Sequence, residues 1–129
     1  MIEIPNSGTL LASAARTTTT TSSTFNIDAG RNLLVYLVPT VASGTGGLTL
    51  KIEIQDPISG SWASIGNDTG PRLTASIIGF VVGPGSSASG SLANSTFVTK
   101  QFPICGTCRV TVVAGDASSY TYSVTYTIA

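Results

Sequence analysis

The segment of residues 48–62 combines a strict alternation of residue types with a tight-turn sequence. Its apolar members are Leu48, Leu50, Ile52 and Ile54, and its polar members are Thr49, Lys51, Glu53 and Gln55. A period of two places one side of a β-strand in a core and the other side in water. Asp56-Pro57-Ile58-Ser59-Gly60 then supplies Asp, Pro and a Gly able to adopt positive φ, as a hairpin turn requires. The segment predicts two antiparallel strands, the second opened by Trp62.

The rest of the chain follows the same pattern and lacks a sustained helical period. Short apolar runs are separated by Gly, Pro, Ser and Asn, which is typical of sandwiches and barrels. We expect strands at residues 9–15, within 17–27, and at 33–41, 48–55, 61–65, 73–82, 96–102, 109–114 and 120–128. The predicted fold is all-β: a single antiparallel β-sandwich, with a jelly-roll order as one version of it.

A length of 129 residues fits one domain with a real core. We expect residues 1–16 to form an N-terminal arm or irregular segment and residues 17–129 to form the sandwich. The Thr-rich stretch 17–23 admits two interpretations, because it reads as a flexible linker by composition while Thr is a good strand former. We favour an ordered arm.

Charge is scarce and balanced along the whole chain. Charged residues make up 9% of the sequence, against roughly a quarter in ordinary domains, and six basic and six acidic side chains cancel. No basic stripe favours a nucleic-acid partner. Because net charge helps to keep proteins monomeric, the surface is either a Thr-rich coat in water or is partly covered by neighbouring subunits.

Targeting and membrane signals are absent from the sequence pattern. The start, Met1-Ile2-Glu3-Ile4-Pro5, lacks the basic and apolar regions of a signal peptide. The apolar runs 33–38 and 77–82 are far too short to span a bilayer. We expect a protein made in the cytoplasm, with no membrane partner.

The residue types that usually carry catalysis are almost all missing. The chain contains no histidine, which removes the commonest general base and metal ligand and every Ser-His or Cys-His pair. Glu53 and Asp56 lie close in sequence, but Glu53 occupies the polar side of a strand and Asp56 a turn position, so a glycosidase-type pair is disfavoured. Asp116 follows Gly115 and reads as another turn residue. We predict no catalytic, cofactor-binding or metal-binding residues, and no enzyme.

Cys105-Gly106-Thr107-Cys108 has the spacing of a zinc knuckle or a thioredoxin-like pair. Zinc needs four ligands, which this chain alone cannot supply. The redox motif needs a helix N-terminus, and a strand pattern follows instead. Three interpretations stay open: two reduced structural residues, a local disulfide, or a metal or crosslink between subunits.

The aromatic residues also admit two interpretations. Trp62 and the tyrosines could form a sugar-binding platform. The alternation of the last strand more simply buries Tyr120, Tyr122 and Tyr126 against an opposite sheet.

Several short motifs, in order, resemble those of one family. They are residues 13–17 (Ser-Ala-Ala-Arg-Thr) before a Thr-rich strand, residues 51–60 (Lys-Ile-Glu-Ile-Gln-Asp-Pro-Ile-Ser-Gly), Pro103 followed by residues 108–112 (Cys-Arg-Val-Thr-Val), Gly115-Asp116, and residues 122–124 (Tyr-Ser-Val). The chain resembles the small β-sandwich virion proteins of tailed bacteriophages, whose genes lie near the major capsid gene.

The resemblance implies a capsid decoration or cement protein on the outside of an HK97-like coat shell. Its partners would be the major capsid protein and sister subunits, with a trimer favoured, and its place would be the capsid surface. We expect the segment up to about Ile27 and the loops of residues 83–94 to make these contacts. The alternatives are a tail or baseplate structural protein and a host-surface, carbohydrate-binding module.

A substitution in the hairpin turn tests the predicted conformation of Gly60. Gly60→Val should lower the free energy of unfolding by about 1–2 kcal/mol, because a β-branched residue resists positive φ. Chemical denaturation followed by tryptophan fluorescence measures the change. An unchanged midpoint would mean that Gly60 does not adopt positive φ.

Overall fold

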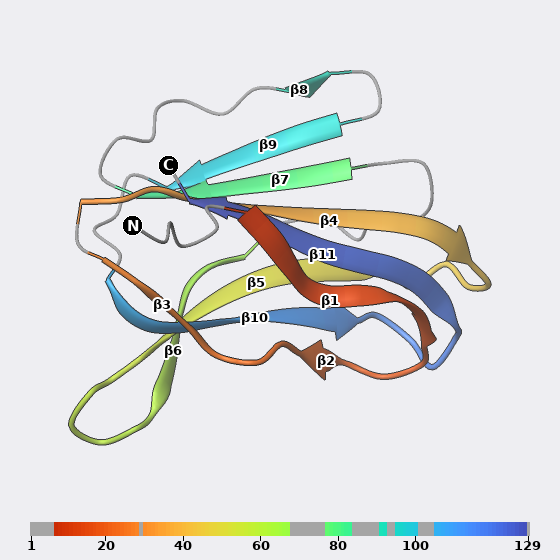
Figure 1. Cartoon of the computed structure of the whole chain (residues 1–129). Coiled ribbons are helices and arrows are strands. Elements are labelled where there is room, and N and C mark those ends of the chain that lie inside the picture. Colours follow the sequence, from red (N-terminus) through yellow and green to blue (C-terminus); the bar gives the residue numbers. More distant parts are fainter. Residues whose placement is uncertain are drawn as a thin grey trace.

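The computed structural model describes residues 7–28, 30–67, 77–83, 91–92, 95–100 and 105–128. All regular structure within these ranges is β-strand (Figure 1). The strands are β1 (Ser7–Arg16), β2 (Thr20–Thr21), β3 (Phe25–Ile27), β4 (Leu33–Ala42), β5 (Leu48–Gln55), β6 (Trp62–Asn67), β7 (Ile77–Val82), β8 (Ser91–Leu92), β9 (Ser95–Lys100), β10 (Gly106–Ala114) and β11 (Tyr120–Ile128).

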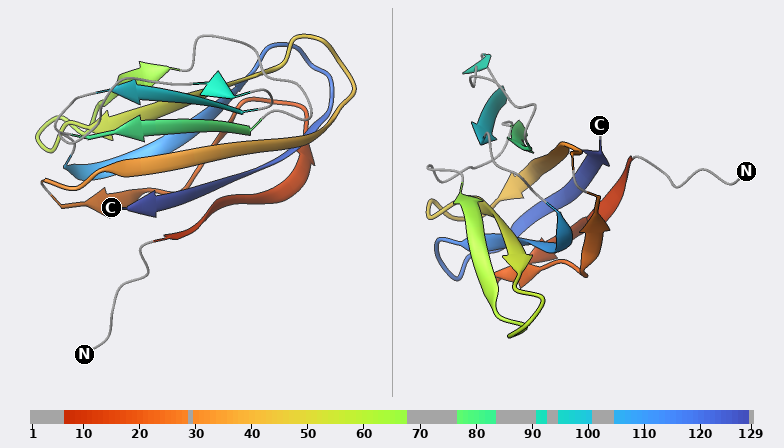
Figure 2. Two further views of the ribbon diagram at one scale, coloured as in Figure 1. Left: turned by 90° about the horizontal axis from the view of Figure 1, so that it is seen from above. Right: turned by 90° about the vertical axis from the view of Figure 1, so that its left-hand side faces the viewer.

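The strands form two sheets that pack face to face, so the predicted β-sandwich is confirmed (Figures 1 and 2). We name them sheet A, with the order β1-β11-β4-β7-β9-β8, and sheet B, with the order β2-β10-β5-β6 and with β3 also pairing with β10. Neighbouring strands are antiparallel apart from β7 and β9, which run parallel. That pair departs from the wholly antiparallel pairing of a jelly roll.

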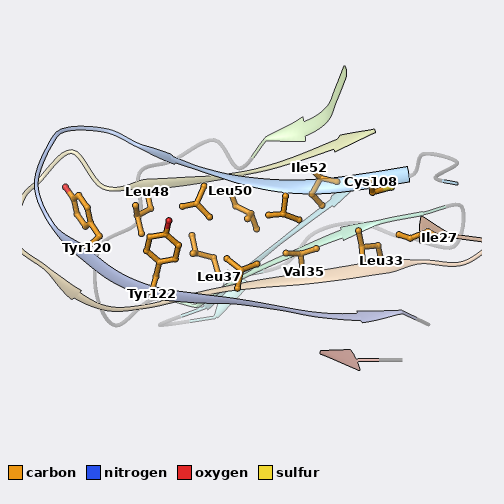
Figure 3. Packing of buried hydrophobic residues seen from close by; sticks show 13 residues of the cluster. Ile27, Leu33, Val35, Leu37, Leu48, Leu50, Ile52, Cys108, Tyr120 and Tyr122 are labelled. Carbon is orange, nitrogen blue, oxygen red and sulfur yellow. The ribbon is translucent and has the colours of Figure 1, made fainter. Parts of the chain in front are cut away.

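The core lies between β4 and β11 of sheet A and β5 and β10 of sheet B (Figure 3). Alternate residues of each strand point inward, as the period of two predicted. The buried apolar cluster consists of Ile27, Leu33, Val35, Leu37, Leu48, Leu50, Ile52, Cys108, Val110, Val112, Tyr120, Tyr122 and Val124. Full burial of each Val, Leu or Ile contributes about 1.5–3 kcal/mol, so this cluster is the main source of stability.

The N-terminal part of the described chain is built into both sheets. β1, which covers most of the residues expected to form an arm or irregular segment, pairs antiparallel with β11 along its length. The chain then crosses to sheet B, where β2 and β3 pair with β10. Ser22, between them, donates its N–H to the Val110 carbonyl over 2.8 Å and accepts the Val110 N–H with its hydroxyl over 3.0 Å. The Thr-rich stretch is therefore ordered; residues 1–6 lie outside the described part.

Two connections between the sheets run side by side at one end of the sandwich. Residues 43–47 lead from β4 to β5, and residues 115–119 lead from β10 to β11. Ser43 and Ser119 join them, because the Ser43 N–H and hydroxyl both donate to the Ser119 carbonyl and the Ser119 N–H donates back to the Ser43 hydroxyl. A Cβ on Gly46 would lie 2.7 Å from Asp116 Cγ, so glycine is needed for the close approach.

Asp116 and Tyr120 complete this double connection, which we call the loop clip (residues 43–47 and 115–119 with Tyr120). Asp116 Oδ2 accepts the Gly46 N–H over 2.9 Å, and Asp116 Oδ1 accepts the Tyr120 hydroxyl over 2.8 Å. The Tyr120 oxygen in turn accepts the Gly47 N–H over 2.9 Å. The backbone hydrogen bond from Gly46, followed by those from Tyr120 and Ser118, lowers the pKa of Asp116. The carboxylate therefore stays charged and holds the two connections together.

Tyr122 lies two residues beyond Tyr120 on β11, and both residues are only 1% exposed. Its hydroxyl points into the apolar layer between the sheets (Figure 3). Among the described residues this hydroxyl has no hydrogen-bond partner. A buried polar group without a partner costs free energy.

Substituting the two tyrosines in turn separates these roles. Tyr120→Phe should lower the melting temperature, because it removes the hydroxyl that links Asp116 to Gly47. Tyr122→Phe should leave stability unchanged or raise it by up to about 1 kcal/mol, because it removes an unpaired buried hydroxyl. Thermal unfolding of both variants gives the comparison. Equal losses would contradict the assigned hydrogen bonds.

Candidate functional site

The outer side of sheet B carries a partly buried ion pair between Glu53 of β5 and Arg109 of β10. The two residues are direct cross-strand partners. Arg109 Nε donates to Glu53 Oε1 over 3.3 Å and Nη2 to Oε2 over 3.2 Å. Glu53 faces away from the core as predicted, but the expectation that this side lies in water is wrong for Glu53, which is only 6% exposed. The cross-strand guanidinium and its neighbours cover it.

Polar and aromatic neighbours extend this pair across the sheet. The Thr111 hydroxyl donates to Glu53 Oε1 over 2.6 Å, and Thr21 of β2 hydrogen-bonds Thr111 over 3.1 Å. On the other side, the Arg109 guanidinium carbon lies 4.1 Å from the centroid of the Trp62 ring. We call these five residues the sheet B cluster. It ties β2, β10, β5 and β6 together.

The surroundings of Glu53 keep its carboxylate ionised. Burial acts to raise its pKa, but hydrogen bonds from Thr111 and Arg109 and the positive charges of Lys51 and Arg109 outweigh burial. The pKa of Glu53 is therefore lowered. A proton donor for acid catalysis needs a raised pKa. We therefore interpret the Glu53–Arg109 contact as a structural ion pair.

This arrangement disfavours the interpretation of the aromatic residues as a sugar-binding platform. The Arg109 guanidinium already occupies a face of the Trp62 ring. Tyr120 and Tyr122 are buried between the sheets, as predicted. Tyr126 is half-buried and stacks on Phe25 with ring centroids 6.0 Å apart.

The turn between β5 and β6 is held by hydrogen bonds from both of its ends. Asp56 Oδ1 accepts the Ile58 N–H over 3.0 Å and Oδ2 accepts the Ser59 hydroxyl over 2.7 Å. The Asp56 carbonyl accepts the Gly60 N–H over 2.9 Å. Gly60 has φ = 77°, which confirms the positive φ expected from the sequence. The hydrogen bonds from Ser59 and Ile58 lower the pKa of Asp56, so this carboxylate caps the turn.

Arg16 closes an irregularity at the edge of sheet A. β1 carries one residue more than β11 between the pairs Leu11–Val124 and Ala14–Tyr122. Arg16 Nη2 donates to the Ala12 carbonyl over 2.6 Å, and Nη1 donates to the Tyr122 carbonyl over 3.0 Å. Its guanidinium carbon lies 4.6 Å from the Tyr122 ring centroid. Arg16 thus satisfies backbone groups at the β-bulge.

The two cysteines are both free and differ in burial. Cys108 lies in the core at the start of β10, where burial, followed by the nearby Cys105, raises its pKa to about 11. Cys105 is exposed. Of the three interpretations, two reduced residues fit this structure, and a local disulfide does not. A thiol with so high a pKa is a poor nucleophile.

Two of the sequence candidates fall mainly outside the described ranges. These are Pro103 and most of the loops of residues 83–94. Within the ranges that are described, no three His, Cys, Asp or Glu side chains gather as metal ligands. In the same ranges no helix has the length and apolarity to cross a membrane.

Comparisons with protein families, with curated proteins and with solved structures find no match to this chain.

Replacing Glu53 tests the assigned ion pair through its pH dependence. Because the pKa of Glu53 is lowered on folding, its contribution is present at neutral pH and is lost as the pH falls through the folded-state pKa. Glu53→Gln should destabilise the protein at neutral pH by about 1–2 kcal/mol, and the difference from the wild type should narrow in acid. Urea unfolding of both proteins at a series of pH values measures this difference in the free energy of unfolding. The exposed Asp28→Asn is the matched control, and a deficit that is constant with pH would contradict the ion pair.

Proposed function

We propose that this chain is a structural virion protein, a capsid decoration or cement protein that binds and stabilises the outside of a coat shell. The proposal rests on the sequence resemblance to small phage β-sandwich proteins. It is supported by one structural observation: the charged residues in the resembling motifs, apart from Lys51, make contacts that hold the fold together.

Five of the six charged motif residues, all except Lys51, have a structural partner. Arg16 binds the backbone at the β1 bulge, and Asp56 builds the β5–β6 turn. Arg109 pairs with Glu53 on sheet B, and Asp116 holds the loop clip. Because these charged motif residues stabilise the fold, they favour a structural protein whose function depends on a rigid and well-defined shape.

A rigid and nearly uncharged sandwich suits a repeated lattice. Several modest contacts per oligomer give tight retention, because after the first contact the others form at high effective concentration. Sister subunits and the major capsid protein would be the partners, with a trimer favoured. The segment up to about Ile27, including β1, β2 and β3 along one side of the sandwich (Figure 1), would contribute contacts.

A tail or baseplate protein would share this fold and composition, so copy number is the deciding measurement. We expect purified particles to contain this chain in numbers comparable with the coat protein, counted by quantitative mass spectrometry. Purified chain should also bind coat shells that lack it and should raise the temperature at which they disrupt. A copy number that is a small fraction of the coat protein, or no binding to shells, would contradict the proposal.

A further inference from the structure

The loop clip contains one carboxylate, Asp116, and this carboxylate is surrounded by hydrogen-bond donors. Besides the Gly46 N–H on Oδ2 and the Tyr120 hydroxyl on Oδ1, Oδ1 accepts the Ser118 N–H over 3.0 Å. The Tyr120 oxygen already accepts the Gly47 N–H, so the proton of this hydroxyl is free to point at Asp116. An ionised carboxylate only accepts hydrogen bonds, and it therefore matches this set of donors.

A proton on Asp116 would end this match. A neutral carboxyl group carries an O–H that must itself donate, and the backbone N–H groups of Gly46 and Ser118 cannot accept it. The hydrogen bonds that remain would also be weaker, because bonds to a charged group are roughly twice as strong as bonds between neutral groups. Protonation would therefore weaken the bonds that join the β4–β5 connection to the β10–β11 connection.

No second charge in the two connections can take over this role. Residues 43–47 are Ser-Gly-Thr-Gly-Gly, and residues 115–119 are Gly-Asp-Ala-Ser-Ser. Tyr120 is the titratable group that faces Asp116. The adjoining ends of the four core strands, which are residues 40–42, 48–50, 112–114 and 120–121, carry no charged side chain, and neither do the threonines of residues 17–21 beside β10. Arg16 pairs with Tyr120 in register, but its guanidinium binds the carbonyls of Ala12 and Tyr122.

The two connections depend on hydrogen bonds because they have no large apolar side chains to pack together. Their backbones lie in close contact, since a Cβ on Gly44 would collide with Ser118 and a Cβ on Gly115 would collide with the Gly46 carbonyl. Glycine loses more conformational freedom on folding than any other residue. Once their hydrogen bonds weaken, glycine-rich connections therefore gain entropy by separating.

We propose that the loop clip is an acid-sensitive switch: protonation of Asp116 separates residues 43–47 from residues 115–119 while the two sheets stay folded. Such local opening occurs in proteins at a lower free energy than unfolding of the whole domain. The buried apolar cluster contains no acidic residue among those that the structure describes, so acid leaves its packing unchanged. Opening would uncover the end of the core at Tyr120 and Leu48, which lie side by side there and are each 1% exposed (Figure 3).

The direction of the switch follows from the folded state. The hydrogen bond from Gly46, followed by those from Tyr120 and Ser118, lowers the pKa of Asp116. A group of this kind contributes its stabilisation above its unfolded-state pKa and loses that stabilisation as the pH falls through its folded-state pKa. The clip is therefore closed at neutral pH and opens only below the ordinary pKa of an aspartate.

Amide hydrogen exchange, followed by NMR between neutral pH and about pH 2, tests the switch in the full-length chain. The protection factors of the Gly46 and Gly47 amides should fall at least about tenfold, as the loss of a charge-assisted hydrogen bond implies. The midpoint should coincide with the titration of the Asp116 carboxyl carbon. The amides that pair β5 with β10 at the centre of sheet B should stay protected through this transition.

Two variants assign the transition to Asp116. Asp116→Asn should give low protection at Gly46 and Gly47 already at neutral pH, without a further acid transition. Asp56→Asn, which removes the other turn carboxylate, is the matched control and should keep the transition of the wild type. Thermal unfolding verifies that both variants fold, and the wild-type titration is decisive by itself if Asp116→Asn does not.

Three results would overturn the proposal. The first is protection at Gly46 and Gly47 that persists after Asp116 has titrated. The second is a simultaneous loss of protection in the clip and in the β5–β10 pairing, because acid would then unfold the whole sandwich. The third is a wild-type acid transition in Asp116→Asn, since another group would then control the opening.

Discussion

The sandwich depends on one geometric constraint: β4 continues into β5 and β10 into β11 through connections that lie against each other. These four strands supply nearly all of the buried core. The loop clip joins the two crossings through the hydrogen bonds of Asp116, Tyr120 and Ser43. It therefore holds sheet A and sheet B together at that end of the core.

On the outer side of sheet B an ion pair links neighbouring strands, whereas apolar packing holds the inner side. Glu53 and Arg109 are cross-strand neighbours, and Thr111 and Trp62 extend their contact to β2 and β6. The short strand β2 has two residues and could not hold its place by backbone pairing alone. A hydrogen bond between the Thr21 and Thr111 hydroxyls supplements that pairing, as does the hydrogen bond that the Val110 N–H donates to the Ser22 hydroxyl.

Local patterns predicted most of the fold, and contacts between distant residues account for the rest. Alternation identified β5 and β11, and the Asp-Pro-Ile-Ser-Gly sequence identified the turn with Gly60 at positive φ. Asp116 was predicted only as a turn residue, because its partner Gly46 lies 70 residues away in the sequence. The burial of Glu53 depends on its register with Arg109, and the parallel pairing of β7 with β9 depends on topology. None of these leaves a signal in a short window of sequence.

The ion pair of the sheet B cluster has a consequence for the response of the fold to salt. Glu53 and Arg109 neutralise each other within the chain. The pair therefore adds no net charge to the outer side of sheet B that could steer a partner. Because Glu53 is only 6% exposed, dissolved ions are expected to screen this pair much less than they would screen a fully exposed one.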